Sequence, residues 1–449
     1  MTTMGSWLID RMEQAADHIA VASGGTETTY RVLLDRVDSW RDALLARDII
    51  GRVLSIEGEY GVESIALFLA AVQTGNIIVP ICNDGRAHLE AFLELGQVEC
   101  RIALLDETPV VSATGRAATH EFYARLRNAG AAGLVLFSSG STGAPKAAVH
   151  DLGPLLEKFI GPRHCYRTLV FLQLDHIGGI NTLFYTLANA GTVVVAEGRM
   201  PRQVCEAIAR HRVELLPTSP TFLNILLLSE ECPRHDLSSL KVITYGTEPM
   251  PATTLNRVHA AFPDVKLQQT YGLSEIGILR SQSRGPDSLW VRVGGEGYET
   301  KVVDGKLWVR AKSAMMGYLN APSRFDADGF FDTGDLVEVD GEWLKILGRK
   351  SDLINVAGSK VFPMEVENTL LEMDNVEDVA VRGEPSALTG QAVVAAVRLA
   401  HDEPPAEFKI RMRLFCRDRL AAYKIPAKVE FTGPVINARF KKMRQAVTP

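Results

Sequence analysis

The sequence predicts an α/β protein with a large N-terminal domain of layered α/β sheets, a β-rich subdomain and a small α+β domain at the C-terminus. Helical and strand patterns alternate from the N-terminus to about residue 245, which is typical of a parallel sheet covered by helices. From about Gly297 short strands with Asp-Gly turns take over, and after Arg349 a separate set of helices and strands follows. We therefore expect two domains, residues 1–350 and residues 351–449.

The first elements alternate in type. A helix opens at Thr29-Tyr30, with apolar residues at the helical spacing through Leu45. A second helix over Glu63–Thr74 ends at Gly75, and the strand Ile77–Ile81 follows it. Further strands, each followed by a turn signal or a helix, are predicted at residues 133–137, 168–172, 192–195, 214–217 and 241–244.

The second half of the chain predicts antiparallel structure and then a compact module. Asp-Gly pairs at 304–305 and 340–341 lie between alternating apolar residues, a pattern that indicates β-hairpins. After Arg349 we expect a helix, two strands and a second helix, at residues 363–371, 376–382, 391–399 and 408–422. No Gly- or Pro-rich linker precedes this module, so its boundary is expected to be a hinge of a few residues.

The composition excludes several classes of protein. The 449 residues are 46% hydrophobic and 23% charged, with a net charge of −6, so no overall positive field attracts nucleic acid. The longest apolar run, residues 65–72, is far shorter than the roughly 20 residues of a membrane span. Six scattered cysteines form no CxxC pair and no zinc spacing. We expect a cytoplasmic protein with reduced cysteines and no bound zinc.

A strand-to-loop segment carries the strongest chemical signal. The apolar run 134–137 leads into SSGSTGAPK, whose cradle residues are Ser138, Ser139, Gly140, Ser141, Thr142, Gly143 and Lys146. Glycines let backbone N–H groups approach a phosphate, hydroxyls donate further hydrogen bonds, and the lysine adds charge. Pro145 precedes the lysine, so the segment is not a Walker A loop. Seven specified positions match by chance in on the order of one chain in 10⁵. The loop therefore predicts phosphate binding.

This loop resembles the phosphate-binding motif of the ANL adenylating superfamily, which comprises acyl- and aryl-CoA synthetases, peptide-synthetase adenylation domains and luciferases. Further motifs follow in the expected order at residues 246–249, 269–275, 333–335 and 348–349. The resemblance runs from about Thr29 to the C-terminus. It implies the ANL fold, in which the small C-terminal domain is mobile.

The resemblance also implies roles for individual residues. It implies an adenine-binding group made of Gly246, Thr247, Glu248, Tyr271 and Gly272, in which the tyrosine stacks on the base. In the family's YGxTE motif the hydroxyl, here Ser274, contacts the α-phosphate, and the glutamate, here Glu275, helps hold Mg²⁺. Asp335 and Arg349 correspond to the residues that reach the ribose. Singly each of these residues has an ordinary structural explanation, but their order around the phosphate loop favours function.

A late lysine completes the pattern. Family members carry a lysine in a GKxxR setting that grips the carboxylate and the α-phosphate during adenylation. Lys441 takes that place if Phe440 replaces the usual glycine, and Lys442 is the alternative occupant. A basic run near a terminus is also typical of a solvated tail. The hinge position corresponds to Ser351, where Asp or Lys is usual, and Gly358 corresponds to a position bordering the pantetheine tunnel.

The segment 172–179 resembles the FHxGG stretch of acyl- and aryl-CoA ligases, which places His176 beside the acyl pocket. The alternative is a histidine satisfied by backbone groups in a strand–helix turn. Amino-acid-activating relatives place an aspartate here, but Asp175 is one residue out of register, which favours an acid without an amino group. We expect a small or aryl acid in a pocket lined by Phe184, Thr218, Ser219, Phe222 and residues 244–248.

The resemblance implies an ATP-dependent enzyme that activates a carboxylic acid to an acyl-adenylate and releases pyrophosphate. The acyl group is then transferred to a thiol, either of CoA or of carrier-protein phosphopantetheine. Mg²⁺ is the implied metal. Two alternatives stay open: a stand-alone amino-acid adenylation enzyme that loads a carrier protein, and a catalytically silent nucleotide- or acyl-binding regulator. The N-terminal portion is short for the superfamily, so a second subunit in a homodimer is one way to cover its sheet edges.

Overall fold

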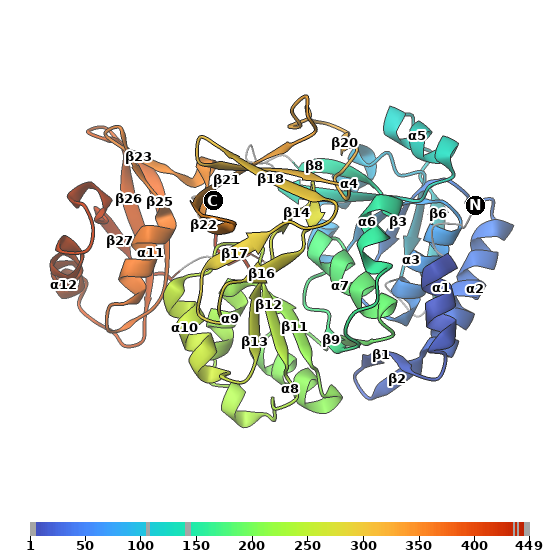
Figure 1. Ribbon diagram of the computed structural model, residues 1–449, viewed down its shortest axis with the longest axis horizontal. Helices are drawn as coiled ribbons and strands as arrows, with labels where there is room; N and C mark the ends of the chain where they lie inside the picture. The colour runs from blue at the N-terminus through green and yellow to red at the C-terminus, as the bar shows by residue number, and fades with distance from the viewer. Residues whose placement is uncertain (1–5, 105–107, 140–144, 434–435, 438–439, 444–449) are drawn as a thin grey trace.

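The computed structural model describes residues 6–104, 108–139, 145–433, 436–437 and 440–443. Figure 1 shows the N-terminal sheets and helices on one side, a β-rich layer above them, and the C-terminal domain at the opposite end. No helix in these described ranges is both long and apolar enough to cross a bilayer.

Two seven-stranded sheets form the N-terminal domain. In the first, all strands but the last are parallel, in the order β13 (Lys266–Gln269), β12 (Val242–Tyr245), β11 (Leu215–Thr218), β9 (Arg167–Leu169), β10 (Thr192–Val195), β1 (Ile19–Ser23) and β2 (Thr26–Thr29). The second has a parallel centre and antiparallel edges, in the order β20 (Gly317–Tyr318), β8 (Pro145–Asp151), β7 (Gly133–Ser139), β4 (Ile77–Ile81), β3 (Val53–Glu57), β5 (Cys100–Ala103) and β6 (Val110–Ala113).

Helices cover these sheets and separate them. Their bounds are α1 (Ser6–Gln14), α2 (Tyr30–Ala46), α3 (Val62–Gln73), α4 (Leu89–Leu95), α5 (Glu121–Ala129), α6 (Leu152–Leu156), α7 (Ile177–Ala188), α8 (Pro201–His211), α9 (Pro220–Leu228) and α10 (Ala252–Ala261). Helix α3 is buried along nearly its whole length, and its Phe68 meets Phe184 of α7 edge-on at 5.7 Å. Both helices share one core with strands of both sheets, so they form the layer between them.

The β-rich subdomain is antiparallel where its sequence predicts hairpins. Its six strands lie in the order β16 (Ser281–Ser283), β17 (Trp290–Val293), β22 (Trp343–Arg349), β21 (Phe331–Asp340), β19 (Lys306–Ala311) and β18 (Tyr298–Val303). Asp304 and Gly305 both have positive φ, which suits a tight hairpin turn. A short separate pair, β14 (Gly272–Leu273) and β15 (Gly277–Ile278), follows the first sheet.

The C-terminal domain packs two helices on a five-stranded sheet. Its elements are β23 (Ile354–Val356), β24 (Ser359–Val361), α11 (Pro363–Leu371), β25 (Val376–Ser386), β26 (Gly390–Leu399), α12 (Pro405–Arg417) and β27 (Lys428–Glu430). It has its own hydrophobic core. The expected division after residue 350 falls within the 3₁₀ turn Lys350–Asp352, and it stays a prediction. The other 3₁₀ turns span Asn83–His88, Glu157–Phe159, Cys232–Arg234 and Ala422–Lys424.

Most predicted elements are confirmed, but several of their ends differ. The strand expected to end at residue 382 continues to Ser386, and the helix expected to begin at residue 408 begins at Pro405. The strand expected to reach Leu172 ends at Leu169, because Phe171 turns back to donate its N–H to the Leu169 carbonyl. The helix expected to reach Ala422 ends at Arg417, although Leu420 continues its apolar spacing and is buried. There the chain folds into the 3₁₀ turn Ala422–Lys424, which brings β27 beside β26.

Candidate functional site

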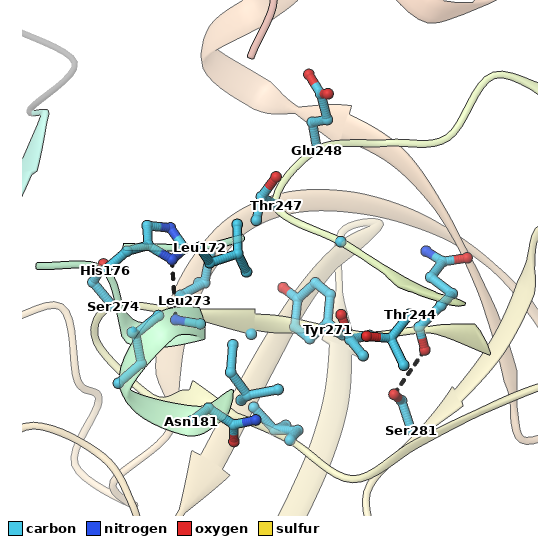
Figure 2. Close-up of a pocket in the computed structure, with 18 of the residues that line it drawn as sticks. Leu172, His176, Asn181, Thr244, Thr247, Glu248, Tyr271, Leu273, Ser274 and Ser281 are labelled. Carbon is cyan, nitrogen blue, oxygen red and sulfur yellow. Dashed lines mark hydrogen bonds between the residues drawn. The ribbon is translucent and has the colours of Figure 1, made fainter. Parts of the chain in front are cut away.

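One large cavity, of about 1790 Å³, lies between the N-terminal domain, the β-rich subdomain and the C-terminal segment. The predicted site residues on its wall are Ser138, Lys146, His176, Gly246, Thr247, Glu248, Tyr271, Gly272, Ser274, Glu275, Asp335, Arg349 and Lys441. Figure 2 shows part of this wall, with Tyr271 between Thr247 and Asn181. The structure therefore gathers segments that are up to 300 positions apart in the sequence.

The phosphate-loop segment is held by a hairpin. Strands β7 and β8 pair antiparallel, with Ser138 opposite Lys146 and Ser139 opposite Pro145. Asn320 fixes the start of β8, since its amide donates to the Pro145 carbonyl at 2.9 Å and its oxygen accepts from Ala147. Gly140, Ser141, Thr142, Gly143 and the side chain of Ser139 lie outside the described residues. Lys146 is thus brought to the cavity wall by the second strand of the hairpin.

Glu275 is oriented by a tyrosine that the sequence did not single out. The hydroxyl of Tyr318 donates to Glu275 Oε1 at 2.6 Å, and Lys146 Nζ lies 5.5 Å from the centre of the Tyr318 ring. Burial, and then the neighbouring Glu275 carboxylate, raise the pKa of Tyr318, so its hydroxyl keeps its proton and acts as a donor. Tyr318 lies in β20, which pairs with β8. This pairing places the Glu275 carboxylate on the same side of the cavity as Lys146 of β8.

Ser274 is fixed from behind by a buried histidine. His150 Nε2 lies 2.6 Å from the carbonyl oxygen of Ser274, and because a carbonyl only accepts, this nitrogen carries the proton. Burial lowers the pKa of His150, which keeps the ring neutral. The backbone of Ser274 is therefore held while its side chain faces the cavity.

Tyr271 and Asp335 form a buried pair. The tyrosine hydroxyl donates to Asp335 Oδ2 at 2.6 Å, and Arg349 Nε lies 3.5 Å from Asp335 Oδ1. Thr333 caps the same turn, because its hydroxyl accepts from the N–H of Asp335. Burial raises the pKa of Asp335, and Arg349 and Tyr271 act in the opposite direction. A carboxylate oxygen accepts more than one hydrogen bond, so Asp335 retains acceptor capacity toward the cavity.

The segment 246–248 runs close beneath the end of β13. A Cβ on Gly246 would lie 2.5 Å from the Thr270 hydroxyl and 2.9 Å from its carbonyl oxygen, so only glycine fits there. Thr247 has a φ of 74°, a strained conformation for a threonine. Its buried hydroxyl has no hydrogen-bond partner among the described residues. Glu248 caps α9 by accepting from the Thr221 N–H at 2.8 Å.

His176 caps a helix and also lines the cavity, and its role beside the acyl pocket stays a prediction. Its Nδ1 accepts from the N–H of Gly178 at 3.0 Å and so caps α7, as the structural alternative predicted. The ring also lines the cavity (Figure 2). Asp175 is buried and does not belong to the cavity lining, in keeping with its different register.

The two candidate lysines have different surroundings. Lys442 Nζ pairs with Asp378 at 2.5 Å and also donates to the Val379 carbonyl, within the C-terminal domain. Both lysines line the cavity, and the N–H of Lys441 is held by the side chain of Asn437 at 3.0 Å. The difference lies in the ammonium of Lys442, which is engaged by Asp378.

Phe440 has a backbone conformation that favours glycine. Its φ is 53°, in the left-handed region that favours glycine. Its ring packs against Phe171 and Phe222, with centroids 5.3 and 5.4 Å away, and against the guanidinium of Arg199. Its carbonyl accepts from the Ser219 hydroxyl at 2.8 Å. The departure from the family motif thus anchors the C-terminal segment on the N-terminal domain.

Part of the predicted acyl pocket is wrong. Thr218, Thr244, Gly246, Thr247 and Glu248 line the cavity, but Phe184, Ser219 and Phe222 do not. Phe184 packs into the interior between the sheets. Ser219 and Phe222 contact Phe440. The lining also includes side chains for which the sequence offered no signal, among them Lys158, Asn181, Arg280 and Tyr318.

The expected hinge position and the glycine expected to border the pantetheine tunnel both lie at the start of the C-terminal domain. Ser351 is exposed in the 3₁₀ turn that follows β22, with its hydroxyl donating to Asp352 at 3.0 Å. Gly358 has a φ of 87° in the turn between β23 and β24.

Comparisons with known proteins agree with this architecture. Residues 8–319 match the family described as AMP-binding enzyme, and residues 365–437 match the AMP-binding enzyme C-terminal domain. The chain is 25% identical to a 2-succinylbenzoate–CoA ligase of Geobacillus kaustophilus, covering 99% of this chain and 97% of the relative. It is 28% identical to a feruloyl-CoA synthase of an Amycolatopsis species, covering 96% and 95%.

A solved structure extends the likeness to three dimensions. The amide bond synthetase McbA of Marinactinospora thermotolerans matches with a TM-score of 0.76 and 25% identity, over 97% of this chain and 96% of that one. The sequence matches span both domains, and the structural match covers the whole arrangement around the cavity. The chain therefore belongs to the AMP-binding enzyme family, which confirms the resemblance to the ANL superfamily.

Proposed function

We propose that this protein is an AMP-forming acid–thiol ligase that activates a carboxylic acid with ATP and passes the acyl group to a thiol. The observation that carries the proposal is the gathering of Lys146, Glu275, Asp335 and Lys441 on one cavity wall. Relatives named as CoA ligases for 2-succinylbenzoate, ferulate and indoleacetate support CoA as the acceptor and an aryl acid as the substrate.

In the first step ATP is held along the cavity. The adenine lies beside Tyr271 and the 246–248 segment, and the ribose hydroxyls donate to Asp335, with Arg349 beside it. The phosphates lie at the hairpin that carries Ser138 and Lys146, whose backbone and charge suit an anion.

The chemical step is an in-line displacement. A carboxylate oxygen of the acid attacks the α-phosphorus, the bond from that phosphorus to the bridging oxygen breaks, and pyrophosphate leaves. Lys441 and the Ser274 hydroxyl stabilise the negative charge on the α-phosphate oxygens, and His176 borders the incoming carboxylate.

The donors around Glu275 fit Mg²⁺. The described residues contain no group of three or more His, Cys, Asp or Glu that would form a protein cage for a metal. Mg²⁺ usually takes one or two carboxylates and completes its shell with phosphate oxygens and water. Glu275, oriented by Tyr318 and close to Lys146, supplies such a carboxylate. When bound there, the ion neutralises charge on the phosphates.

The second step needs Lys441 to leave. The C-terminal domain turns about the Ser351 region, and a thiolate attacks the acyl carbon while AMP departs. Carrier-protein pantetheine is the alternative acceptor. Assembly as a homodimer and a cytoplasmic location remain predictions from the sequence.

ATP–pyrophosphate exchange over matched panels of aryl, fatty and amino acids tests the first step. We expect exchange with aryl acids and thioester formation with CoA. Exchange driven by amino acids alone would favour the carrier-loading alternative, and ATP binding without exchange for any acid would favour the silent regulator. Lys441→Ala is expected to abolish exchange yet to spare thioester formation from a supplied acyl-adenylate. Survival of both half-reactions would show that the lysine is misassigned.

A further inference from the structure

A lysine that the proposed chemistry does not use lies in the cavity wall. Lys158 belongs to the 3₁₀ turn Glu157–Phe159. Its ammonium donates to the side-chain oxygen of Asn181 at 2.5 Å and to the carbonyl of Ile278 at 2.6 Å. An ammonium has three N–H donors, so one donor remains for a further acceptor.

The cavity wall around Lys158 carries positive charge without a paired carboxylate in the described part of the chain. Arg163 and Arg280 also line the cavity, and in the described part of the chain no ion pair involves either of them or Lys158. Burial first, and then the two neighbouring arginines, lower the pKa of Lys158 to about 7. A buried cation with only neutral partners is costly to keep charged. An anion that enters the cavity would restore the balance.

The position of Lys158 relative to the reacting carboxylate is set by α7. His176 caps the helix, and Asn181, the partner of Lys158, lies five residues further along. At 1.5 Å per residue this is about 7.5 Å along the helix axis. In Figure 2 Asn181 lies on the opposite side of Tyr271 from Thr247 and Glu248. The cation therefore lies further along α7 than His176, which the proposed function places beside the incoming carboxylate.

Resting on the proposed function, we propose that the acid activated here carries a second carboxylate, which Lys158 binds while Arg163 and Arg280 add a favourable field. Asn181 acts as a positioning residue that fixes the ammonium. The spacing suits rigid aryl dicarboxylates with their acid groups at opposite ends of the ring, and aliphatic dicarboxylates of similar length. One carboxylate becomes the adenylate and the other stays an anion.

The competing explanation is a structural lysine that only ties α7 to β15. Under that explanation, replacing Lys158 lowers stability but changes the kinetics of all acids alike. The two explanations therefore differ in whether the loss depends on the second carboxylate.

The test compares matched acids by ATP–pyrophosphate exchange: benzene-1,4-dicarboxylate against 4-methylbenzoate, and adipate against hexanoate. We expect the dicarboxylate of at least one pair to be preferred by about 30-fold or more in kcat/KM. Lys158→Met should lower kcat/KM for the dicarboxylate far more than for the monocarboxylate, which removes the preference, and Lys158→Arg should retain part of it. Lys312→Met is the control, because Lys312 is exposed, pairs with Glu157 and lies outside the cavity lining.

The outcomes separate this inference from the proposed function. Exchange that proceeds best with monocarboxylates in the wild-type protein, or a preference that survives Lys158→Met, overturns the inference and leaves the function standing. If no acid drives exchange, the proposed function fails. Calorimetric binding of benzene-1,4-dicarboxylate to the wild-type and Lys158→Met proteins then decides the inference: loss of binding in the variant supports it, and equal or absent binding overturns it.

Discussion

The carbonyl oxygen of Phe440 accepts a hydrogen bond from the Ser219 hydroxyl at 2.8 Å, across 221 positions of sequence. The same Ser219 hydroxyl caps α9 by accepting from the Phe222 N–H at 3.1 Å. Because Lys441 follows Phe440 directly, this contact sets where the lysine enters the cavity. It joins the end of the C-terminal domain to the first seven-stranded sheet.

Replacing Phe440 by glycine tests that anchor. Glycine keeps the positive φ without strain, so the change removes only the ring that packs on Phe171 and Phe222. Losing this contact should cost about 1–2 kcal/mol, which corresponds to an exchange rate roughly 5- to 30-fold lower. Thioester formation from a supplied acyl-adenylate should change less than threefold. Equal losses in the two half-reactions would contradict a role confined to adenylation.

Lys442 and Lys441 should differ in what they stabilise. Lys442 and Asp378 form a pair that is almost fully buried, with side chains 7% and 1% exposed. Removing one partner of such a pair typically costs about 3–5 kcal/mol. Lys442→Met should therefore lower the denaturant midpoint of the C-terminal domain, whereas Lys441→Met should leave it unchanged and stop exchange. If Lys441→Met lowers the midpoint and Lys442→Met stops exchange, Lys442 is the catalytic lysine and Lys441 the structural one.

Asp335→Asn should weaken the binding of ATP and leave the binding of the acid unchanged. The carboxylate accepts from Tyr271 and faces the cavity, and each lost hydrogen bond to a charged group is worth about 1.5–3 kcal/mol. We expect the KM for ATP to rise at least about tenfold with the KM for the acid unchanged. Tyr271→Phe serves as a comparison, since it removes the hydroxyl but keeps the ring. A change in the acid KM alone would place the nucleotide elsewhere.

Lys158 should make the free energy of unfolding rise as the pH is raised above about 7. Its pKa is about 7 in the folded state and near the ordinary value of 10.5 in the unfolded chain. Between these values the unfolded state binds more protons, so the free energy of unfolding rises with pH over that window. The rise is lost in Lys158→Met. Urea titrations of both proteins at pH 7 and pH 9.5 measure this rise. If the free energy of unfolding changes equally with pH in the two proteins, burial does not perturb the pKa of the amine.

The local patterns of the sequence identify the fold well. Apolar spacing predicts α2 and α11, and β4 has its predicted bounds. The end of α12 is missed because Leu420 continues the helical period from a turn. The strand β8 is missed because its start follows a polar loop, and only pairing with β7 makes it a strand.

The residues of the site also differ in how well the sequence predicts them. Short motifs predict the residues proposed to bind the nucleotide, and most of these residues line the cavity. Tyr318 and Lys158 have no such motif: the first meets Glu275 through β20, and the second meets Asn181 through the packing of α7. Phe184 was wrongly placed in the pocket because helical spacing does not reveal which face of a fully buried helix adjoins a cavity.

The pair between Lys442 and Asp378 has a consequence for the reaction cycle. It ties the last described residues to their own domain. In the proposed rotation of that domain, the ring of Phe440 is therefore withdrawn from its contacts with Phe171 and Phe222. In the proposed reaction cycle this aromatic contact therefore breaks and re-forms once in each turnover.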